Sequence, residues 1–209
     1  MKPLYLLIVS LACASNLYSQ KEDFEGTITF VRSFKSKNDM TNDELRLFFG
    51  DTVLVTIKKG NYKQKCPNAN GITDVIYRSK ENRYYMKYKD VDTLYFYDGL
   101  KDTSKILSIT IDSVNRKNIL GFECNSLTMN FSKRTITYYY SPIFYKNPDN
   151  FTNHILFHYD TYISQSQAIH LQSIVDDEFY FVQSTAIDIK KRSINDDSFE
   201  LPALPIVQK

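Results

Sequence analysis

The feature that most constrains the fold is a period-two alternation of apolar and polar side chains. Residues 24–30 show it first, where Phe24, Ile28 and Phe30 alternate with charged or hydroxyl-bearing residues. Successive side chains of a β-strand point to opposite faces, so this spacing places the apolar residues on one face of an extended segment. The pattern predicts strands that turn one face towards a core.

The same pattern recurs in short segments along most of the chain, separated by charged or glycine-containing turns. The 16 tyrosines and 14 phenylalanines add to this signal, because aromatic side chains favour strands. Short strands with local turns favour an antiparallel sheet over β-α-β units. Beyond residues 24–30, the expected strands are residues 53–57, 62–66, 72–77, 84–88, 93–97, 106–111, 119–131, 135–140, 169–175 and 179–191.

Three segments interrupt the alternation. Thr41 is followed three residues later by Glu44, a spacing typical of a helix N-terminus, so a turn of helix is expected there. Residues 141–167 carry Pro142 and Pro148 near their start and predict either a short helix from about 148 to 157 or a long excursion over one sheet face. The tail from about residue 201 is expected to lack regular structure.

The N-terminus resembles a secretory signal. A charge at Lys2 is followed by an apolar run over residues 4–12 and by small and polar residues up to a cut between Ser19 and Gln20. The run is shorter than the about 20 residues that a membrane span needs. We therefore expect residues 1–19 to be a signal peptide and residues 20–209 to form a single secreted domain with no transmembrane segment.

Two alternatives to simple cleavage remain open at the N-terminus. Cys13 would become an acylated N-terminus in a lipoprotein signal, although Ser10 stands where such signals usually carry an aliphatic residue. An uncleaved anchor is the other alternative.

Residues 20–209 carry 25 basic and 24 acidic side chains, so the mature chain offers no general attraction for nucleic acid.

Two cysteines, Cys66 and Cys124, remain in the predicted mature chain. In an oxidising compartment an isolated pair most simply forms one disulfide, and we predict that these two are joined. A metal site would need further ligands, and a catalytic cysteine would need a basic partner.

The residues that catalysis or metal binding would need are sparse. His154 and His158 are four residues apart and would share one face of a helix, where Asp160 and His170 could complete a metal site. The residues between the two histidines are apolar, which is typical of packing and not of a metal site. No phosphate loop, nucleophile elbow or dinucleotide fingerprint is present. We predict a protein that is not an enzyme and has no metal and no cofactor; a hydrolase using paired carboxylates is the open alternative.

Aromatic residues occur on both faces of several expected strands, as in residues 84–85, 95–97 and 138–140. One interpretation is cross-strand packing in a core. The other is a concave apolar surface that holds an acyl chain or another hydrophobic ligand. Stacking on nucleic-acid bases would require a basic groove, and the lysines near these strands are offset by acids.

A family resemblance rests on four short stretches. Residues 119–124 (ILGFEC), 138–142 (YYYSP) and 199–202 (FELP) follow the opening 24–28 (FEGTI) in this order. The chain thereby resembles secreted Gram-negative envelope proteins of the GLPGLI-type group and their relatives, which are similar to the lipoprotein carriers LolA and LolB. The GLPGLI hexapeptide itself is absent, and residues 150–162 occupy the corresponding region.

The resemblance implies an incomplete antiparallel β-barrel, curved around a hydrophobic hollow that short helices partly cover. In the carriers such a hollow shields the acyl chains of lipoproteins that cross the periplasm. For this chain the resemblance implies a periplasmic or outer-membrane-associated protein with a lipid or acyl-chain ligand and, by extension, an envelope protein partner.

Together these observations predict a mainly β fold, a curved antiparallel sheet or LolA-like half-barrel with one or two short helices, that binds a hydrophobic ligand in its concave face. The alternative is a structural or adhesive envelope module that contacts proteins or glycans and has no small-molecule ligand. A hollow of several hundred Å³ would favour the first hypothesis and a filled core the second. The sequence does not reveal the strand register, so it does not show which of the candidate lining residues face the concave side. These candidates are Phe30, Ile57, Tyr85, Phe96, Met129, Tyr138 and Phe181.

Overall fold

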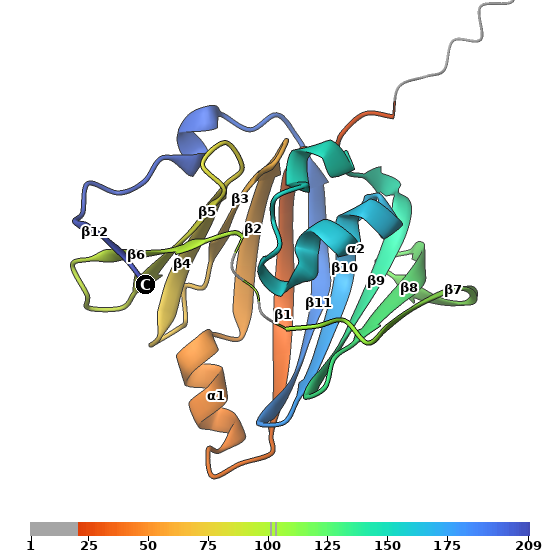
Figure 1. Cartoon of the computed structure of the whole chain (residues 1–209), viewed down its shortest axis with the longest axis horizontal. Coiled ribbons are helices and arrows are strands. Elements are labelled where there is room, and N and C mark those ends of the chain that lie inside the picture. The colour runs from red at the N-terminus through yellow and green to blue at the C-terminus, as the bar shows by residue number, and fades with distance from the viewer. Residues whose placement is uncertain (1–20, 101, 103) are drawn as a thin grey trace, which may run out of the picture.

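The computed structural model describes residues 21–100, 102 and 104–209 (Figure 1). The predicted signal peptide and Cys13 lie outside these residues, so secretion, cleavage and lipid attachment stay predictions.

The described chain forms one curved sheet of twelve strands, and the predicted mainly β, antiparallel architecture is confirmed. The strand order is β12-β6-β5-β4-β3-β2-β1-β11-β10-β9-β8-β7, and every pairing except β12 with β6 is antiparallel. The strands are β1 (Gly26–Ser36), β2 (Thr52–Lys58), β3 (Asn61–Lys65), β4 (Ile72–Arg78), β5 (Arg83–Tyr88), β6 (Leu94–Asp98), β7 (Ser108–Ile119), β8 (Phe122–Asn130), β9 (Arg134–Tyr145), β10 (Ala168–Asp177), β11 (Tyr180–Lys191) and β12 (Ile206–Gln208).

The first helix, α1 (Asn42–Phe49), forms where the capping signal predicted it. The Thr41 hydroxyl accepts a hydrogen bond from the Glu44 backbone N–H at 3.2 Å, and the Glu44 carboxylate accepts one from the Thr41 N–H at 2.7 Å. This reciprocal pair satisfies two N–H groups at the start of the helix. At the other end of α1 the Phe49 ring stacks on Phe34 of β1 at 6.1 Å between centroids.

Residues 146–167 cross one face of the sheet, and we call them the covering segment (Figure 1). They contain two 3-10 helices, η1 (Pro148–Phe151) and η2 (Leu156–His158), followed by α2 (Tyr159–Ser166). The predicted helix over residues 148–157 is therefore wrong, and the alternative of an excursion over one sheet face is what the structure shows. In the described part of the chain, no helix combines the length and apolar character needed to cross a membrane.

The break in the covering segment has a backbone cause. Phe157 and His158 both adopt left-handed conformations, with φ of 58° and 53°. Such values cost free energy for residues other than glycine and persist only where surrounding contacts hold them. Two consecutive left-handed residues end η2 and set the direction in which α2 starts at Tyr159.

Two further boundaries differ from the sequence expectation. The expected strand over residues 106–111 is part of a longer strand, β7, which continues to Ile119, and the chain turns at Leu120 and Gly121, both with positive φ. The tail is not wholly irregular, because β12 adds a short parallel strand at the edge of β6. Its pairing begins with the Leu94 N–H, which donates to the carbonyl of Pro205 at 2.8 Å.

Two apolar clusters lie on opposite faces of the sheet. The larger one lies between the concave face and the covering segment and includes Phe30, Leu127 and Tyr162. The smaller one, which we call the convex cluster, consists of Ile76, Tyr85 and Leu94, against which Phe96 and the tail residues Leu201 and Leu204 pack.

The predicted disulfide is not formed. Cys66 and Cys124 are both free thiols and both buried. Cys66 directly follows β3 and Cys124 lies on β8, with β2, β1, β11, β10 and β9 between them in the sheet order. Sequence spacing carries no information on this separation. Burial raises the pKa of both thiols, that of Cys124 to about 11, so both are protonated at neutral pH.

Candidate functional site

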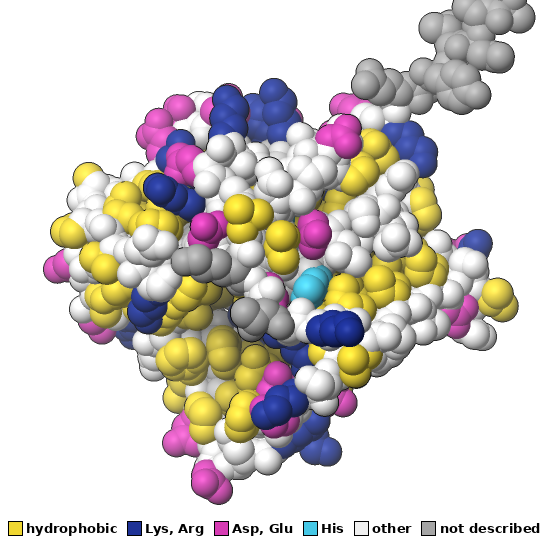
Figure 2. Space-filling view, viewed as in Figure 1, with side chains coloured by type: hydrophobic (Ala, Val, Ile, Leu, Met, Phe, Trp, Pro, Cys, Tyr) yellow, Lys and Arg dark blue, Asp and Glu magenta, His cyan; other side chains and the backbone are white. Residues whose placement is uncertain are grey.

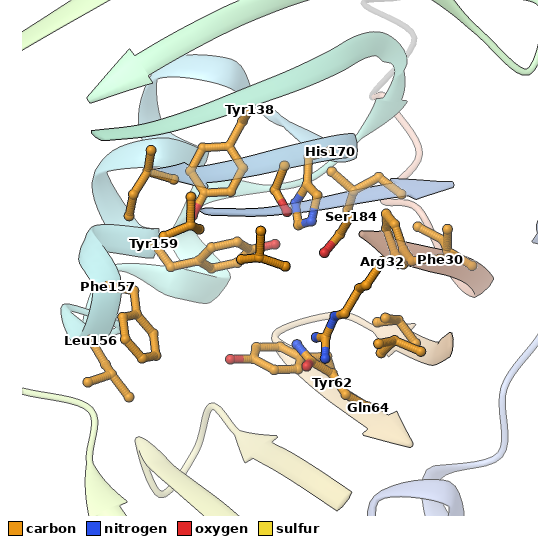
Figure 3. A pocket seen from close by; sticks show the side chains of 18 of the residues that line it. Phe30, Arg32, Tyr62, Gln64, Tyr138, Leu156, Phe157, Tyr159, His170 and Ser184 are labelled. Atoms are coloured by element: carbon orange, nitrogen blue, oxygen red, sulfur yellow. The ribbon is translucent and has the colours of Figure 1, made fainter. Parts of the chain in front are cut away.

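A cavity of about 320 Å³ lies between the concave face of the sheet and the covering segment. Side chains from β1, β2, β3, β5, β9, β10 and β11 line it on the sheet side, and residues of the covering segment line the other side (Figure 3). The space-filling view shows hydrophobic side chains gathered between α1 and the covering segment on this side of the molecule (Figure 2). The cavity is thus a feature of the covered face.

Strand alternation explains which residues reach the cavity. On β1, Ile28, Phe30, Arg32 and Phe34 line it, each two residues after the last. Side chains with this spacing share one face of the strand. Three of the four are apolar, so the same alternation that builds the core delivers one cation, Arg32, into the cavity.

An aromatic group packs where the sheet meets the covering segment. The rings of Tyr62 and Tyr77 stack at 5.3 Å, and Tyr159 of α2 lies 6.2 Å from Tyr62. Phe151 of η1 contacts Tyr159 edge-on at 5.4 Å. Aromatic pairs at these separations are attractive beyond the area that they bury. This group gives the cavity a wall that is mostly apolar and carries hydroxyl groups at its edges.

His154 is buried within this aromatic group and is uncharged. Its Nε2 shares a hydrogen bond of 2.8 Å with the Tyr62 hydroxyl, and its ring lies 4.1 Å from that of Tyr77. Burial lowers the pKa of His154 to about 4. Its Nδ1 has no hydrogen-bond partner among the described residues. The sequence hypothesis of packing histidines fits this residue.

His170 lies on β10 at the side of the cavity. Its ring centroid is 5.5 Å from that of Phe30 and 5.2 Å from that of Tyr138, and Figure 3 shows it among the lining side chains. Burial lowers the pKa of His170 to about 4, so it is neutral above that pH. Within the described residues its Nδ1 makes no hydrogen bond. It is one of the few polar groups that face an otherwise apolar wall.

Three cationic side chains line the cavity, and two of them have carboxylate partners. Lys146 is fully buried, and its Nζ lies 2.7 Å from Asp23 Oδ2. Burial lowers the pKa of this lysine, and the Asp23 carboxylate opposes the shift. Arg134 Nη2 lies 3.6 Å from Asp102 Oδ2. The third cation, Arg32, forms no ion pair within the described residues.

Asp102 and Ser104 hold the bent part of the covering segment. Asp102 accepts a hydrogen bond from the Phe157 N–H at 2.9 Å, and His158 Nε2 donates to the Ser104 carbonyl at 2.8 Å. Burial would raise the pKa of Asp102, but hydrogen bonds from Ser104 and Phe157 outweigh it and leave that pKa below its ordinary value. These contacts supply the support that two left-handed residues need.

The sequence-predicted lining residues divide into three groups. Phe30, Ile57 and Tyr138 line the cavity. Tyr85 and Phe96 point to the other face and belong to the convex cluster. Met129 is fully buried in the main core but outside the cavity wall, and Phe181 alternates with the lining residues of β11.

Sequence reasoning missed several lining residues. A cation on a strand usually faces solvent, so the sequence does not predict that Arg32 lines a cavity, although its spacing from Ile28 and Phe30 places it on their face. Tyr159 belongs to a segment with no clear periodicity, so the sequence does not predict its orientation. In the described ranges, no group of three or more His, Cys, Asp and Glu side chains is arranged to hold a metal ion.

No protein-family model and no curated protein matches the chain. Solved structures with a similar arrangement of elements include PNGF-II, at 12% identity and a TM-score of 0.49 over 88% of this chain and 31% of that one. The chain spans about a third of the length of the PNGF-II chain.

Two further solved structures are matched over most of both chains. An uncharacterized conserved protein from Thermus thermophilus has 6% identity and a TM-score of 0.46, covering 87% of this chain and 91% of that one. A LolA superfamily protein from Nitrosomonas europaea has 10% identity and a TM-score of 0.39, covering 86% and 91%. Similarities at this level assign neither a ligand nor an activity, and the resemblance to the GLPGLI-type group stays a prediction.

Proposed function

We propose that this protein is a non-enzymatic envelope protein that binds a lipid or another hydrophobic ligand in the cavity on its concave face. The observation that carries the proposal is the cavity of about 320 Å³ between sheet and covering segment. Protein interiors are normally packed to the density of organic crystals, so a space of this size is unusual in a core. Small-molecule sites have volumes of about 300–1,000 Å³.

The chemistry of the wall favours an apolar ligand. Aromatic and aliphatic side chains such as Phe30, Val55 and Tyr159 make up most of the lining. Each Å² of apolar surface that a ligand removes from water contributes about 25 cal/mol. The neutral histidines and the tyrosine hydroxyls supply the few polar groups that orient a ligand in such a site.

The titration of the lining residues supports a binding role over acid–base catalysis. Burial lowers the pKa of His154 and His170 to about 4 and raises that of Tyr138 to about 12. A general acid or base works best when its pKa lies near the operating pH. These groups are instead held in uncharged forms across the neutral range, which suits contact with an apolar molecule.

The envelope location rests on residues 1–19, whose pattern is that of a secretory signal. Secretion across the inner membrane would deliver the chain to the periplasm or to the outer membrane, with a lipid anchor on Cys13 as the less favoured alternative. The intact mass of the natural mature protein separates the two, because an acylated N-terminus at Cys13 and a chain starting at Gln20 differ in length and in lipid mass.

A structural or adhesive role without a small ligand is the second candidate function. The observation that favours it is the edge strand β7, where several apolar side chains are exposed to solvent. They are Leu107 just before the strand, then Ile109, Ile111 and Val114. An unpaired strand edge with apolar side chains is a surface suited to a protein partner.

Native mass spectrometry of the full chain purified from its source tests the binding proposal. We expect a non-covalently bound apolar molecule, and we expect the lipid-stripped protein to bind the neutral probe N-phenyl-1-naphthylamine saturably at one site per chain. A protein that carries no such molecule and binds the probe without saturation would overturn the proposal.

A further inference from the structure

We propose that the ligand is a single-chain amphiphile with an anionic head, and that Arg32 binds this head inside the cavity. The inference rests on the proposed function and adds the chemical class of the ligand. It starts from one observation: Arg32 is the lining cation that has no carboxylate partner within the described residues.

The contacts of Arg32 leave its charge uncompensated. Its Nη1 donates to the Phe49 carbonyl at 3.1 Å and lies 3.9 Å from the Cys66 sulfur. Neither acceptor carries a charge, since burial keeps the Cys66 thiol protonated. Both contacts use Nη1, so the N–H groups of Nε and Nη2, three of the five donors of the guanidinium, take part in neither. Figure 3 shows the side chain extending from β1 into the space that the other lining residues surround.

The other charged lining residues do not neutralise Arg32. Lys146 is paired with Asp23, and Arg134 lies beside Asp102. Asp177 lines the cavity at the end of β10, where it pairs in register with Arg134. Asp177 is four residues beyond Ser173, which is about 13 Å along a strand. The carboxylate that lines the cavity thus lies at the level of Arg134, and it forms no ion pair with Arg32 within the described residues.

Small hydroxyl groups continue from Arg32 across the sheet. In the strand register, Arg32 of β1 is opposite Ser184 of β11, Ser184 is opposite Ser173 of β10, and Ser173 is opposite Tyr138 of β9. All four residues line the cavity. The register therefore places one arginine, two serines and one tyrosine at a single level of a mostly apolar surface, and the guanidinium and the serine hydroxyls offer hydrogen bonds to a polar head.

The next levels of the sheet are suited to a hydrocarbon chain. From Arg32, the lining residues of β1 towards the covering segment are Phe30 and Ile28, about 13 Å of strand in all. They lead to Phe151 and Leu156 of the covering segment, which line the same cavity. A volume of about 320 Å³ is at the lower end of the range for small-molecule sites, which favours one chain over several.

The planar guanidinium binds carboxylate and phosphate alike, so the shared feature is an anionic head on a single chain. Three ligands of equal chain length distinguish a carboxylate head, a phosphate head and an uncharged head: dodecanoate, dodecyl phosphate and the neutral dodecanol. Each is titrated into the lipid-stripped full chain by displacement of N-phenyl-1-naphthylamine at neutral pH. We expect at least one of the two anions to bind about tenfold or more tightly than dodecanol.

Three variants assign this preference to Arg32. Arg32→Gln should abolish the difference between the anions and dodecanol while dodecanol still binds, and Arg32→Lys should retain part of it. Arg192→Gln, an exposed arginine just after β11, should leave the difference unchanged. A thermal unfolding curve of each variant identifies any loss that comes from unfolding, since Arg32 also holds the Phe49 carbonyl.

The outcomes distinguish this inference from the proposed function. Equal affinity of the natural chain for dodecanol and both anions, or a preference that persists in Arg32→Gln, overturns the inference and leaves the hydrophobic site standing. If none of the three ligands displaces the probe, both the inference and the proposed function are overturned.

Discussion

The two faces of strands β4–β6 are built from similar residues and differ in how they are covered. Adjacent tyrosines on β5 illustrate this, because Tyr84 faces the cavity and Tyr85 belongs to the convex cluster. On the convex side the tail packs Leu201 and Leu204 directly against the sheet. On the concave side the covering segment leaves a space of about 320 Å³.

The difference lies in how each cover is held. The tail is attached by the pairing of β12 with β6, so its side chains lie against the sheet that they cover. The covering segment is attached through hydrogen bonds at its bend, where Gly99 O accepts from the N–H groups of Ile155 and Leu156, and Asp102 accepts from Phe157. The covering segment also packs the rings of Phe151 and His154 against Tyr77 of the sheet, and the cavity lies beside these contacts. The comparison teaches that the tail follows the sheet through strand pairing, whereas the covering segment contacts it at separate points and leaves space between them.

Truncation in the convex cluster should reduce stability and leave binding unchanged. Leu94 is 1% exposed in this filled cluster, so Leu94→Ala should cost about 2–5 kcal/mol of unfolding free energy. Denaturant unfolding measures the loss, and the affinity for N-phenyl-1-naphthylamine should stay within twofold. A large loss of probe affinity in a folded Leu94→Ala protein would show that the two faces are coupled.

Acid should destabilise the concave side through its buried histidines. The pKa of His154 is about 4 in the folded chain against an ordinary 6.5, so the folded state binds fewer protons than the unfolded state between these values. Stability is then complete above pH 6.5 and falls as the pH drops towards 4, by about 3 kcal/mol for this residue.

The measurement is unfolding by urea at pH 7 and pH 4.5, and the control is His154→Phe, which keeps an aromatic ring in the group. The variant should show a smaller difference between the two pH values than the natural chain. An equal difference in both proteins would mean that His154 is not the buried neutral group described above.

Filling the cavity should abolish binding at little cost in stability. Ser184 lines the cavity, so the ring of Ser184→Phe has space to enter, and unfolding free energy should change by less than about 1 kcal/mol. Probe affinity should fall about tenfold or more. The matched control is Ser33→Phe, an exposed β1 position that alternates with the lining residues, and it should bind like the natural chain. Equal binding by both variants would contradict the location of the site.

The smallest expected effect is at the N-terminal cap of α1. Thr41→Ala removes the hydroxyl that accepts from Glu44 and should cost about 1 kcal/mol. Probe affinity should change little, because α1 contributes only Phe49 to the lining. Thermal unfolding checks the cost, and Thr41→Ser, which keeps the acceptor oxygen, should recover most of it.

The parts of the fold that depend on local patterns could be predicted from the sequence. The alternation in residues 24–30 and the spacing of Thr41 and Glu44 each specify an element by themselves, and both elements are confirmed. The bend at Phe157 and His158 could not be predicted, because its left-handed residues depend on Asp102, which is 55 residues away in the chain. Alternation also left open which face is concave, since a one-residue slip reverses every side chain.

Calorimetric titration of dodecanol into the natural chain and into Ser184→Phe tests the central claim, that the cavity is a ligand site. The account predicts saturable binding of one molecule per natural chain, with a negative heat-capacity change from buried apolar surface, and loss of that binding in Ser184→Phe. The absence of saturable binding to the natural chain, or undiminished binding to Ser184→Phe, would contradict it.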